Sequence, residues 1–174
     1  MLMSLSIRLS MLVGVMALVC LAGGCGCTSK MKTFDIAVEV APGLHSQTVV
    51  VDISGVSIAN DNDWNNVPLN AYWATSDPAK FRESHRSQNL VHTMEFRAGE
   101  SVHTATLSKS DPMWNTWKTQ NAMWLYIVAE AGASQYRKKL TLDSCTWDTK
   151  TNTLNIMITP SGIQPQQSPL PEKR

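Results

Sequence analysis

The amino-acid sequence predicts an all-β protein: an antiparallel β-sandwich of about eight strands with one or two short helices. Short runs in which apolar and polar residues alternate recur over residues 33–160, and a period of two is typical of strands with one buried face. Turn residues separate these runs at short intervals, which favours antiparallel connections of the immunoglobulin-like kind. Apolar residues make up 43% of the 174-residue chain, enough for the core of one domain.

The first predicted strands follow a short polar segment. Every second residue from Phe34 to Val40 is apolar, and residues 41–43 (APG) form a turn signal after them. The β-branched run at residues 47–53 predicts the next strand. Residues 60–66 (NDNDWNN) have the composition of a polar loop, and the alternation at residues 68–73 predicts a further strand.

The second half of the chain supplies the remaining predicted strands. Residues 89–97 and 102–107 flank a glycine-containing turn, which predicts a hairpin. Residues 122–130 are apolar on both faces, which indicates a central strand buried on both sides. Residues 136–142 and 153–159 alternate again and complete the set.

Two Ser-Asp-Pro segments, residues 76–78 and 110–112, predict the starts of short helices, because serine caps a helix and proline is tolerated in its first turn. The second segment leads to Trp114 and Trp117, which would share one helix face. Residues 161–174 contain three prolines and few large apolar side chains, so we expect a disordered tail there.

The amino terminus has the features of a secretory signal peptide, predicted over residues 1–24. Arg8 is its one charged residue, an uncharged apolar stretch covers residues 11–21, and small residues follow at 22–24. The apolar stretch is shorter than the roughly 20 residues that a transmembrane helix requires, so we expect it to be cleaved rather than to remain in the membrane.

Residues 21–25 (LAGGC) resemble the bacterial lipobox, with Ala22 where leucine is usual. The resemblance implies that Cys25 becomes the first residue of the mature protein and carries acyl chains such as palmitate, with residues 25–32 as a tether. Gly26 rather than aspartate follows Cys25, which favours the periplasmic face of the outer membrane. An ordinary signal peptide with incidental cysteines is the alternative.

Charge and motifs argue against several classes of function. Removing residues 1–24 removes one basic residue, Arg8, and no acidic one, so 14 basic and 14 acidic residues remain and nucleic acid is not an expected partner. The sequence has no HExxH, phosphate loop or GxSxG motif, so we expect no enzyme, no metal and no cofactor. Residues 61–63 (DND) resemble the start of a calcium loop, but Asn66 and Tyr72 stand where glycine and glutamate are required.

Two features leave alternatives open. Cys27 and Cys145 form a disulfide if the tether passes near Cys145, since the periplasm is oxidising. Five of the six tryptophans lie in or beside predicted loops and helices, where they either form a contact surface or seal the core; they are Trp64, Trp73, Trp114, Trp117 and Trp147.

The layout of the mature chain resembles the small outer-membrane lipoprotein of type VI secretion systems. Two motifs carry the resemblance: residues 68–73 (PLNAYW) followed by Phe81, and residues 136–139 (YRKK). The run at residues 49–51 (VVV) and the Trp-rich segment near Trp114 depart from that family.

The resemblance implies a transthyretin-like sandwich that anchors an envelope assembly and holds a periplasmic protein partner. It places the candidate partner contact in the segment from Ser54 to Asn66, with these candidate residues: Ser54, Asn60, Asp61, Asp63 and Trp64. The alternatives are a glycan- or ligand-binding lipoprotein that uses exposed tryptophan, and a hydrolase whose site has no recognisable motif.

Overall fold

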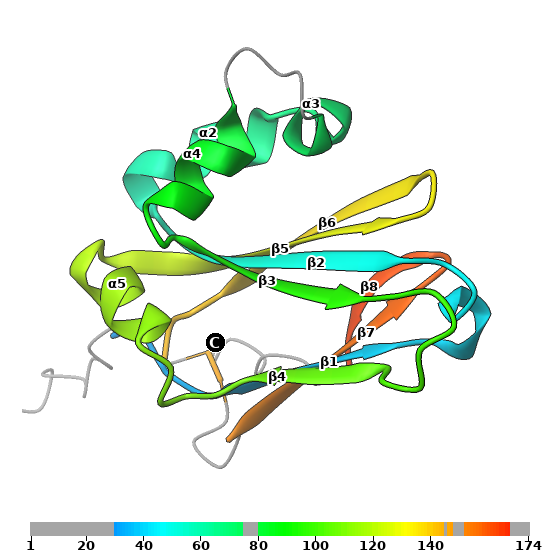
Figure 1. The fold of residues 1–174 in the computed structure, drawn as a ribbon. Helices are drawn as coiled ribbons and strands as arrows, with labels where there is room; N and C mark the ends of the chain where they lie inside the picture. The colour runs from blue at the N-terminus through cyan, green and yellow to red at the C-terminus, as the bar shows by residue number, and fades with distance from the viewer. Residues whose placement is uncertain (1–29, 75–79, 145, 148–151, 168–174) are drawn as a thin grey trace, which may run out of the picture.

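The computed structural model describes residues 30–74, 80–144, 146–147 and 152–167. Two four-stranded sheets pack face to face, and short helices lie over one of them and at its end (Figure 1). The predicted β-sandwich is therefore confirmed. The predicted signal peptide, Cys25, Cys27, Cys145 and the first Ser-Asp-Pro segment lie outside the described residues.

Each sheet has four strands. The first contains, in spatial order, β4 (Thr104–Leu107), β1 (Asp35–Val40), β7 (Thr153–Thr159) and β8 (Gly162–Pro165). The second contains β3 (Val91–Phe96), β2 (Val49–Ser57), β5 (Ala122–Ala131) and β6 (Ser134–Thr141). Neighbouring strands are antiparallel, except that β1 and β7 run parallel. The helices are η1 (Pro42–Leu44), α2 (Ile58–Asn66), α3 (Leu69–Trp73), α4 (Phe81–Ser87) and α5 (Met113–Thr119).

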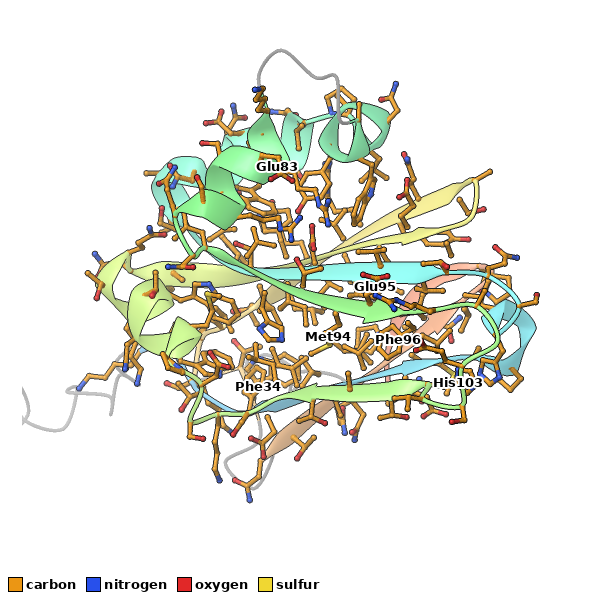
Figure 2. The ribbon with its side chains drawn as sticks, in the orientation of Figure 1. Phe34, Glu83, Met94, Glu95, Phe96 and His103 are labelled. Atoms are coloured by element: carbon orange, nitrogen blue, oxygen red, sulfur yellow. The ribbon has the colours of Figure 1, made fainter. Side chains whose placement is uncertain are left out.

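Alternate side chains of both sheets fill the space between them. Figure 2 shows Phe34, Met94 and Phe96 in this space, and all three are buried. Trp114 and Trp117 of α5 close one end of the core, with the Trp114 ring centroid 5.6 Å from that of Phe34. The helix predicted after the second Ser-Asp-Pro segment is confirmed, and its two tryptophans share the buried face.

Strand β5 is buried on both faces, as its apolar pattern predicts. Leu125 and Ile127 belong to the core between the sheets. Tyr126 and Val128 point the other way and pack beneath the helices α2 and α3. Because β5 pairs with β2 on one side and β6 on the other, it is a central strand.

The prediction for residues 60–73 was wrong. Residues 60–66 belong to helix α2 rather than to a loop, and residues 69–73 form helix α3 rather than a strand. Each helix buries one side chain, Trp64 in α2 and Tyr72 in α3, so neither has an apolar stripe that a period of 3.6 would reveal. Contacts with the sheet, rather than local preference, select the helical conformation.

The predicted hairpin between residues 89–97 and 102–107 was also wrong. Strand β3 pairs with β2, whereas β4 pairs with β1 in the other sheet. The turn between them therefore crosses from one sheet to the other, because Phe96 and Leu107 both bury their side chains in the shared core.

Both ends of the domain are more ordered than predicted. Residues 162–165 form strand β8 rather than a disordered tail, since Ile163 is buried and pairs with Ile158 of β7. Residues 30–32, predicted as tether, pair with residues 142–144 through a β-bridge from Met31 to Asp143. Residues 168–174 lie outside the described part. Within the described ranges, none of the helices has the length and apolar character needed to cross a membrane.

Candidate functional site

Helices α2, α3 and α4 form a cap over the outer face of the second sheet (Figure 1). The cap and the sheet enclose a second apolar cluster that is separate from the main core, and its buried members are Val56, Trp64, Tyr72, Val91, Tyr126 and Val128. Trp64 is the centre of this cluster, with its ring centroid 5.2 Å from that of Phe81 and 5.5 Å from that of Tyr126.

A buried carboxylate, Asp52, joins the cap to the sheet. Asp52 lies in the middle of β2, on the face opposite Val51 and Ile53, and only 1% of it is exposed. Its oxygens accept hydrogen bonds from Tyr72 Oη at 2.9 Å and Thr93 Oγ1 at 2.6 Å. They also accept from Arg82 Nε at 2.6 Å and from Arg82 Nη2 at 3.3 Å. A buried charge with these partners is compensated.

The surroundings of Tyr72 and Arg82 keep both side chains protonated, so both can donate hydrogen bonds to Asp52. Burial raises the pKa of Tyr72, and the negative charge of Asp52 raises it further, so the phenol stays protonated. Burial lowers the pKa of Arg82, but its hydrogen bonds and charge interaction with Asp52 outweigh burial and leave the pKa above its ordinary value. Tyr72 and Arg82 therefore remain donors to Asp52, and their hydrogen bonds hold α3 and α4 on the sheet.

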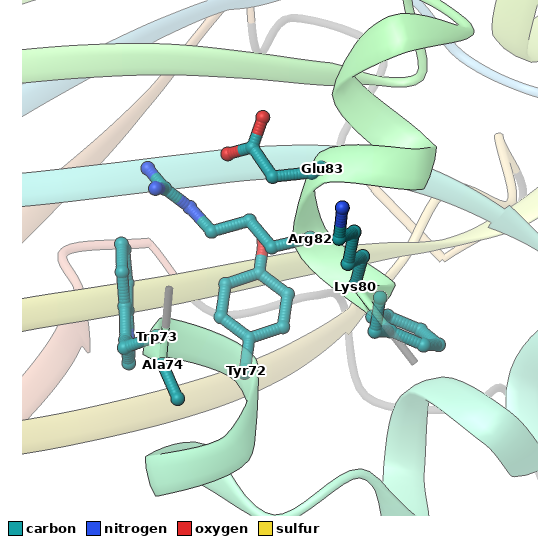
Figure 3. Close-up of a pocket in the computed structure, with 7 residues that line it drawn as sticks. Tyr72, Trp73, Ala74, Lys80, Arg82 and Glu83 are labelled. Atoms are coloured by element: carbon teal, nitrogen blue, oxygen red, sulfur yellow. The ribbon is translucent and has the colours of Figure 1, made fainter. Parts of the chain in front are cut away.

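A pocket of about 440 Å³ opens between α3 and α4, beside this network. Figure 3 shows its lining, which consists of Tyr72, Trp73, Ala74, Lys80, Phe81, Arg82 and Glu83. The guanidinium carbon of Arg82 lies 4.4 Å from the centroid of the Trp73 ring. The indole nitrogen of Trp73 is buried, and the described residues offer it no hydrogen-bond acceptor. The pocket thus combines aromatic walls with basic and acidic groups at its mouth, where Lys80 and Glu83 are exposed.

A second polar network fixes α2 to strands β5 and β6. Lys139 Nζ lies 2.6 Å from Asp61 Oδ1 and 4.0 Å from the centroid of the Trp124 ring. Tyr126 Oη donates to Asp61 Oδ1 at 2.8 Å. Burial raises the pKa of Asp61, but the hydrogen bonds from Lys139 and Tyr126 outweigh it, and the pKa lies below its ordinary value. Asp61 is therefore part of an ion pair that positions α2.

The carboxyl end of α2 is held by an arginine. Arg137 of β6 donates through Nη1 to the carbonyl oxygen of Asn65 at 2.6 Å and through Nη2 to that of Val67. These carbonyls are among the acceptors that a helix end leaves without an internal partner, and a cation there is favourable. Burial lowers the pKa of Arg137.

Of the five predicted partner residues, two are buried, two are exposed, and Asp61 is half-buried. Ser54 is buried, and its hydroxyl donates to the carbonyl oxygen of Leu90 at 2.9 Å. Trp64 is 2% exposed at the centre of the cap cluster, so neither it nor Ser54 can touch a partner in this conformation. Asn60 and Asp63 are exposed on α2. The segment is therefore a helix that offers polar residues to solvent, rather than a loop.

Most of the tryptophans are packing residues. Four are at most 2% exposed: Trp64, Trp114, Trp117 and Trp147. Trp73 and Trp124 are partly exposed, and Lys139 covers the Trp124 ring. Of the two interpretations of the tryptophan-rich segments, sealing the core therefore holds for these four. Trp73 lines the pocket between α3 and α4.

One feature of the sequence indicates the Asp52 network. An acidic residue interrupts the apolar run from Val49 to Ile53, and such a residue in a strand between two sheets or layers requires a partner. Its partners Tyr72 and Arg82 lie 20 and 30 residues further along the chain, in segments whose helices were not fully predicted.

The described residues contain no group of three or more His, Cys, Asp or Glu side chains arranged to hold a metal ion. The DND segment that resembles a calcium loop lies on helix α2, where Asp61 instead pairs with Lys139.

No protein-family model and no curated protein matches the chain. The chain is similar to a solved structure. That structure is Lip of Serratia marcescens, described as a membrane-bound component of the type VI secretion system. The TM-score is 0.49 and the sequence identity 11%, over 80% of this chain and 99% of Lip. The sequence indicated a weak resemblance to the lipoprotein of type VI secretion systems. This comparison likewise returns a component of a type VI secretion system.

Proposed function

We propose that the protein is a non-enzymatic, lipid-anchored component of the bacterial cell envelope whose helical cap binds a protein partner. The pocket between α3 and α4 carries this proposal, because it places Trp73 and Arg82 side by side at an opening to solvent. The lipobox-like sequence ending at Cys25 supports the anchor. No cofactor and no nucleic acid takes part.

The chemistry of the pocket suits a protein side chain or main-chain group. Tryptophan, tyrosine and arginine are the residues that contribute most to protein–protein binding. A volume of about 440 Å³ lies within the usual range for sites that enclose one bound group. The guanidinium group of Arg82, which keeps 18% of its side chain exposed, supplies donors for a carbonyl or carboxylate oxygen of the partner.

The Asp52 network prepares this pocket before the partner arrives. Tyr72 and Arg82 each contribute to the lining, and each is fixed by its hydrogen bond to the buried carboxylate. Side chains that are already ordered lose less conformational entropy on binding, so more of the contact energy appears as affinity.

The specific form of the proposal follows the resemblance to the type VI secretion lipoproteins. In that form the protein sits at the periplasmic face of the outer membrane and acts as a scaffold for the secretion membrane complex. Its partner is then the periplasmic part of an inner-membrane protein. Exposed Asn60 and Asp63 of α2 lie on the same cap and extend the proposed contact beyond the pocket.

Site-specific photocrosslinking in cells tests the partner contact. A photoreactive amino acid is placed at Ala74 or Glu83 beside the pocket, and at Thr106 on the exposed face of the other sheet as a control. We expect both cap positions to yield one covalent adduct with an envelope protein that has a periplasmic domain, and Thr106 to yield none. The same adduct from Thr106, or none from the cap while the anchor is intact, contradicts the proposal.

Labelling with radioactive palmitate tests the anchor. We expect the label in the wild-type protein and in the control Cys27→Ala, and no label in Cys25→Ala. A wild-type amino terminus without fatty acid, measured by intact mass, contradicts the anchor and with it the proposed location.

A further inference from the structure

We propose that one end of the sandwich rests on the bilayer and binds anionic phospholipid headgroups. This basic end is defined by the residues around a pocket of about 360 Å³: Lys30, Met31, Lys118, Asn121, Ala122 and Met123. The inference rests on the proposed function, because it requires acylation of Cys25.

Backbone hydrogen bonds fasten the start of the domain to this end. Ser144 N donates to Lys30 O at 2.9 Å, and Lys32 N donates to Leu142 O at 2.8 Å. Leu142 N in turn donates to Met123 O at 2.8 Å, at the beginning of β5. Lys30 therefore cannot move away from the ends of α5 and β5 without breaking this pairing.

The length of the tether limits where the membrane can lie. Lys30 follows Cys25 by five positions, and an extended chain spans at most about 3.5 Å per position, or roughly 17 Å in all. An acylated Cys25 lies in the outer part of the bilayer, so Lys30 must lie within this distance of the headgroups. Of the surfaces of the domain, the basic end is the one that carries Lys30.

The side chains of this end suit a lipid surface. Lys30 and Lys118 are exposed, and the half-buried Met31 and Met123 lie between them around the pocket. Lysine stems cover apolar groups while their ammonium groups reach the phosphates, and each lysine near an anionic surface favours binding. No acidic residue lines the pocket within the described residues.

Two acidic residues on the elements that form this end have partners of their own. Asp143 stands opposite Met31 in the β-bridge and has an interaction partner, as does Lys32. Asp111, at the other end of α5, accepts a hydrogen bond from Met113 N at 2.8 Å. The exposure of Lys30 and Lys118, together with a pocket lining that contains no acidic residue among those described, leaves their ammonium groups accessible to an anionic surface.

Lysine acetylation of the full lipidated protein tests the inference. The protein is reconstituted in vesicles of phosphatidylcholine alone, or of phosphatidylcholine with phosphatidylglycerol, and the modification of each lysine is measured by mass spectrometry. We expect Lys30 and Lys118 to react about fivefold more slowly in the anionic vesicles at low salt. Exposed Lys80 on the cap and Lys138 on β6 serve as internal controls, with equal rates in both vesicles.

A variant separates binding from simple crowding by the membrane. In Lys30→Gln, protection of Lys118 should decrease, because the two lysines hold the same end to the surface. The matched substitution Lys138→Gln should leave the protection of Lys118 unchanged.

A protein that floats with the vesicles but shows equal acetylation of Lys30 and Lys118 in both lipids overturns this inference alone. A protein that floats with neither vesicle overturns both the inference and the proposed anchor.

Discussion

Arg82 Nε lies 2.6 Å from Oδ2 of Asp52, and this ion pair joins helix α4 to the middle of strand β2, 30 residues earlier in the chain. The carboxylate is almost completely buried, whereas the arginine side chain keeps 18% of its surface exposed and lies over Trp73. The pair thus links the interior of the sheet to the pocket on its surface. Its geometry explains why a charged residue is placed in an otherwise apolar strand.

Removing Arg82 should destabilise the protein strongly. Arg82→Ala leaves the Asp52 carboxylate buried without its cation, and breaking such a pair costs about 3–5 kcal/mol of unfolding free energy. Urea unfolding followed by circular dichroism measures the change. Arg86→Ala, which removes an exposed ion pair of 3.4 Å with Glu83, is the control and should cost less than about 1 kcal/mol. Equal losses for the two variants contradict a structural role for the Asp52 network.

Gly55 allows Trp117 to pack against β2. A Cβ atom at residue 55 would lie 2.5 Å from Cγ of Trp117, whose side chain is fully buried. Gly55→Ala therefore forces the tryptophan or the strand to shift, and we expect a loss of about 1–3 kcal/mol in a thermal or urea unfolding experiment. Gly43→Ala is the matched control, because its Cβ would meet no atom closer than 3.5 Å. An unchanged stability of Gly55→Ala would show that this end of the core is loosely packed.

Patterns of period two predicted β1 and β7 well because each of these two strands has one face in the core. The buried positions of β1 and β7 alternate without interruption, so sequence and structure agree there. Residues 69–73 alternate as well, but Tyr72 turns inward to reach Asp52, and this contact selects a helix. Five residues are too few for periodicity to distinguish the two conformations.

The candidate site was less predictable than the fold. Asp52 was visible as an acid within a run of valines, but no spacing rule connects it with Arg82, because their contact depends on how the cap folds back over the sheet. Ser54 and Trp64 were predicted to contact a partner, and both instead face the interior. Polar composition around them suggested exposure, whereas a single large side chain determines how α2 packs.

The protein should lose stability as the pH falls below about 6.5 because of His92. Burial lowers the pKa of His92, and the charges of Asp111 and Asp52 only partly offset this effect. The unfolded chain therefore binds a proton before the folded protein does, and the free energy of unfolding falls from pH 6.5 until the folded-state pKa is passed. Urea unfolding between pH 7.5 and 5 measures this slope. His92→Gln should flatten it, and an unchanged slope in that variant contradicts the assignment.

Cys27 and Cys145 should form a disulfide in the exported protein. Lys30 O accepts a hydrogen bond from Ser144 N at 2.9 Å, Cys145 follows Ser144 directly, and Cys27 precedes Lys30 by three residues. Three residues span at most about 10 Å, so chain length allows the two thiols to meet. We expect no alkylation of either thiol without reductant, one linked peptide, and a loss of about 4 kcal/mol on reduction. Reduction should not destabilise the control Cys27→Ser, and alkylation of both cysteines in the unreduced wild type would contradict the bond.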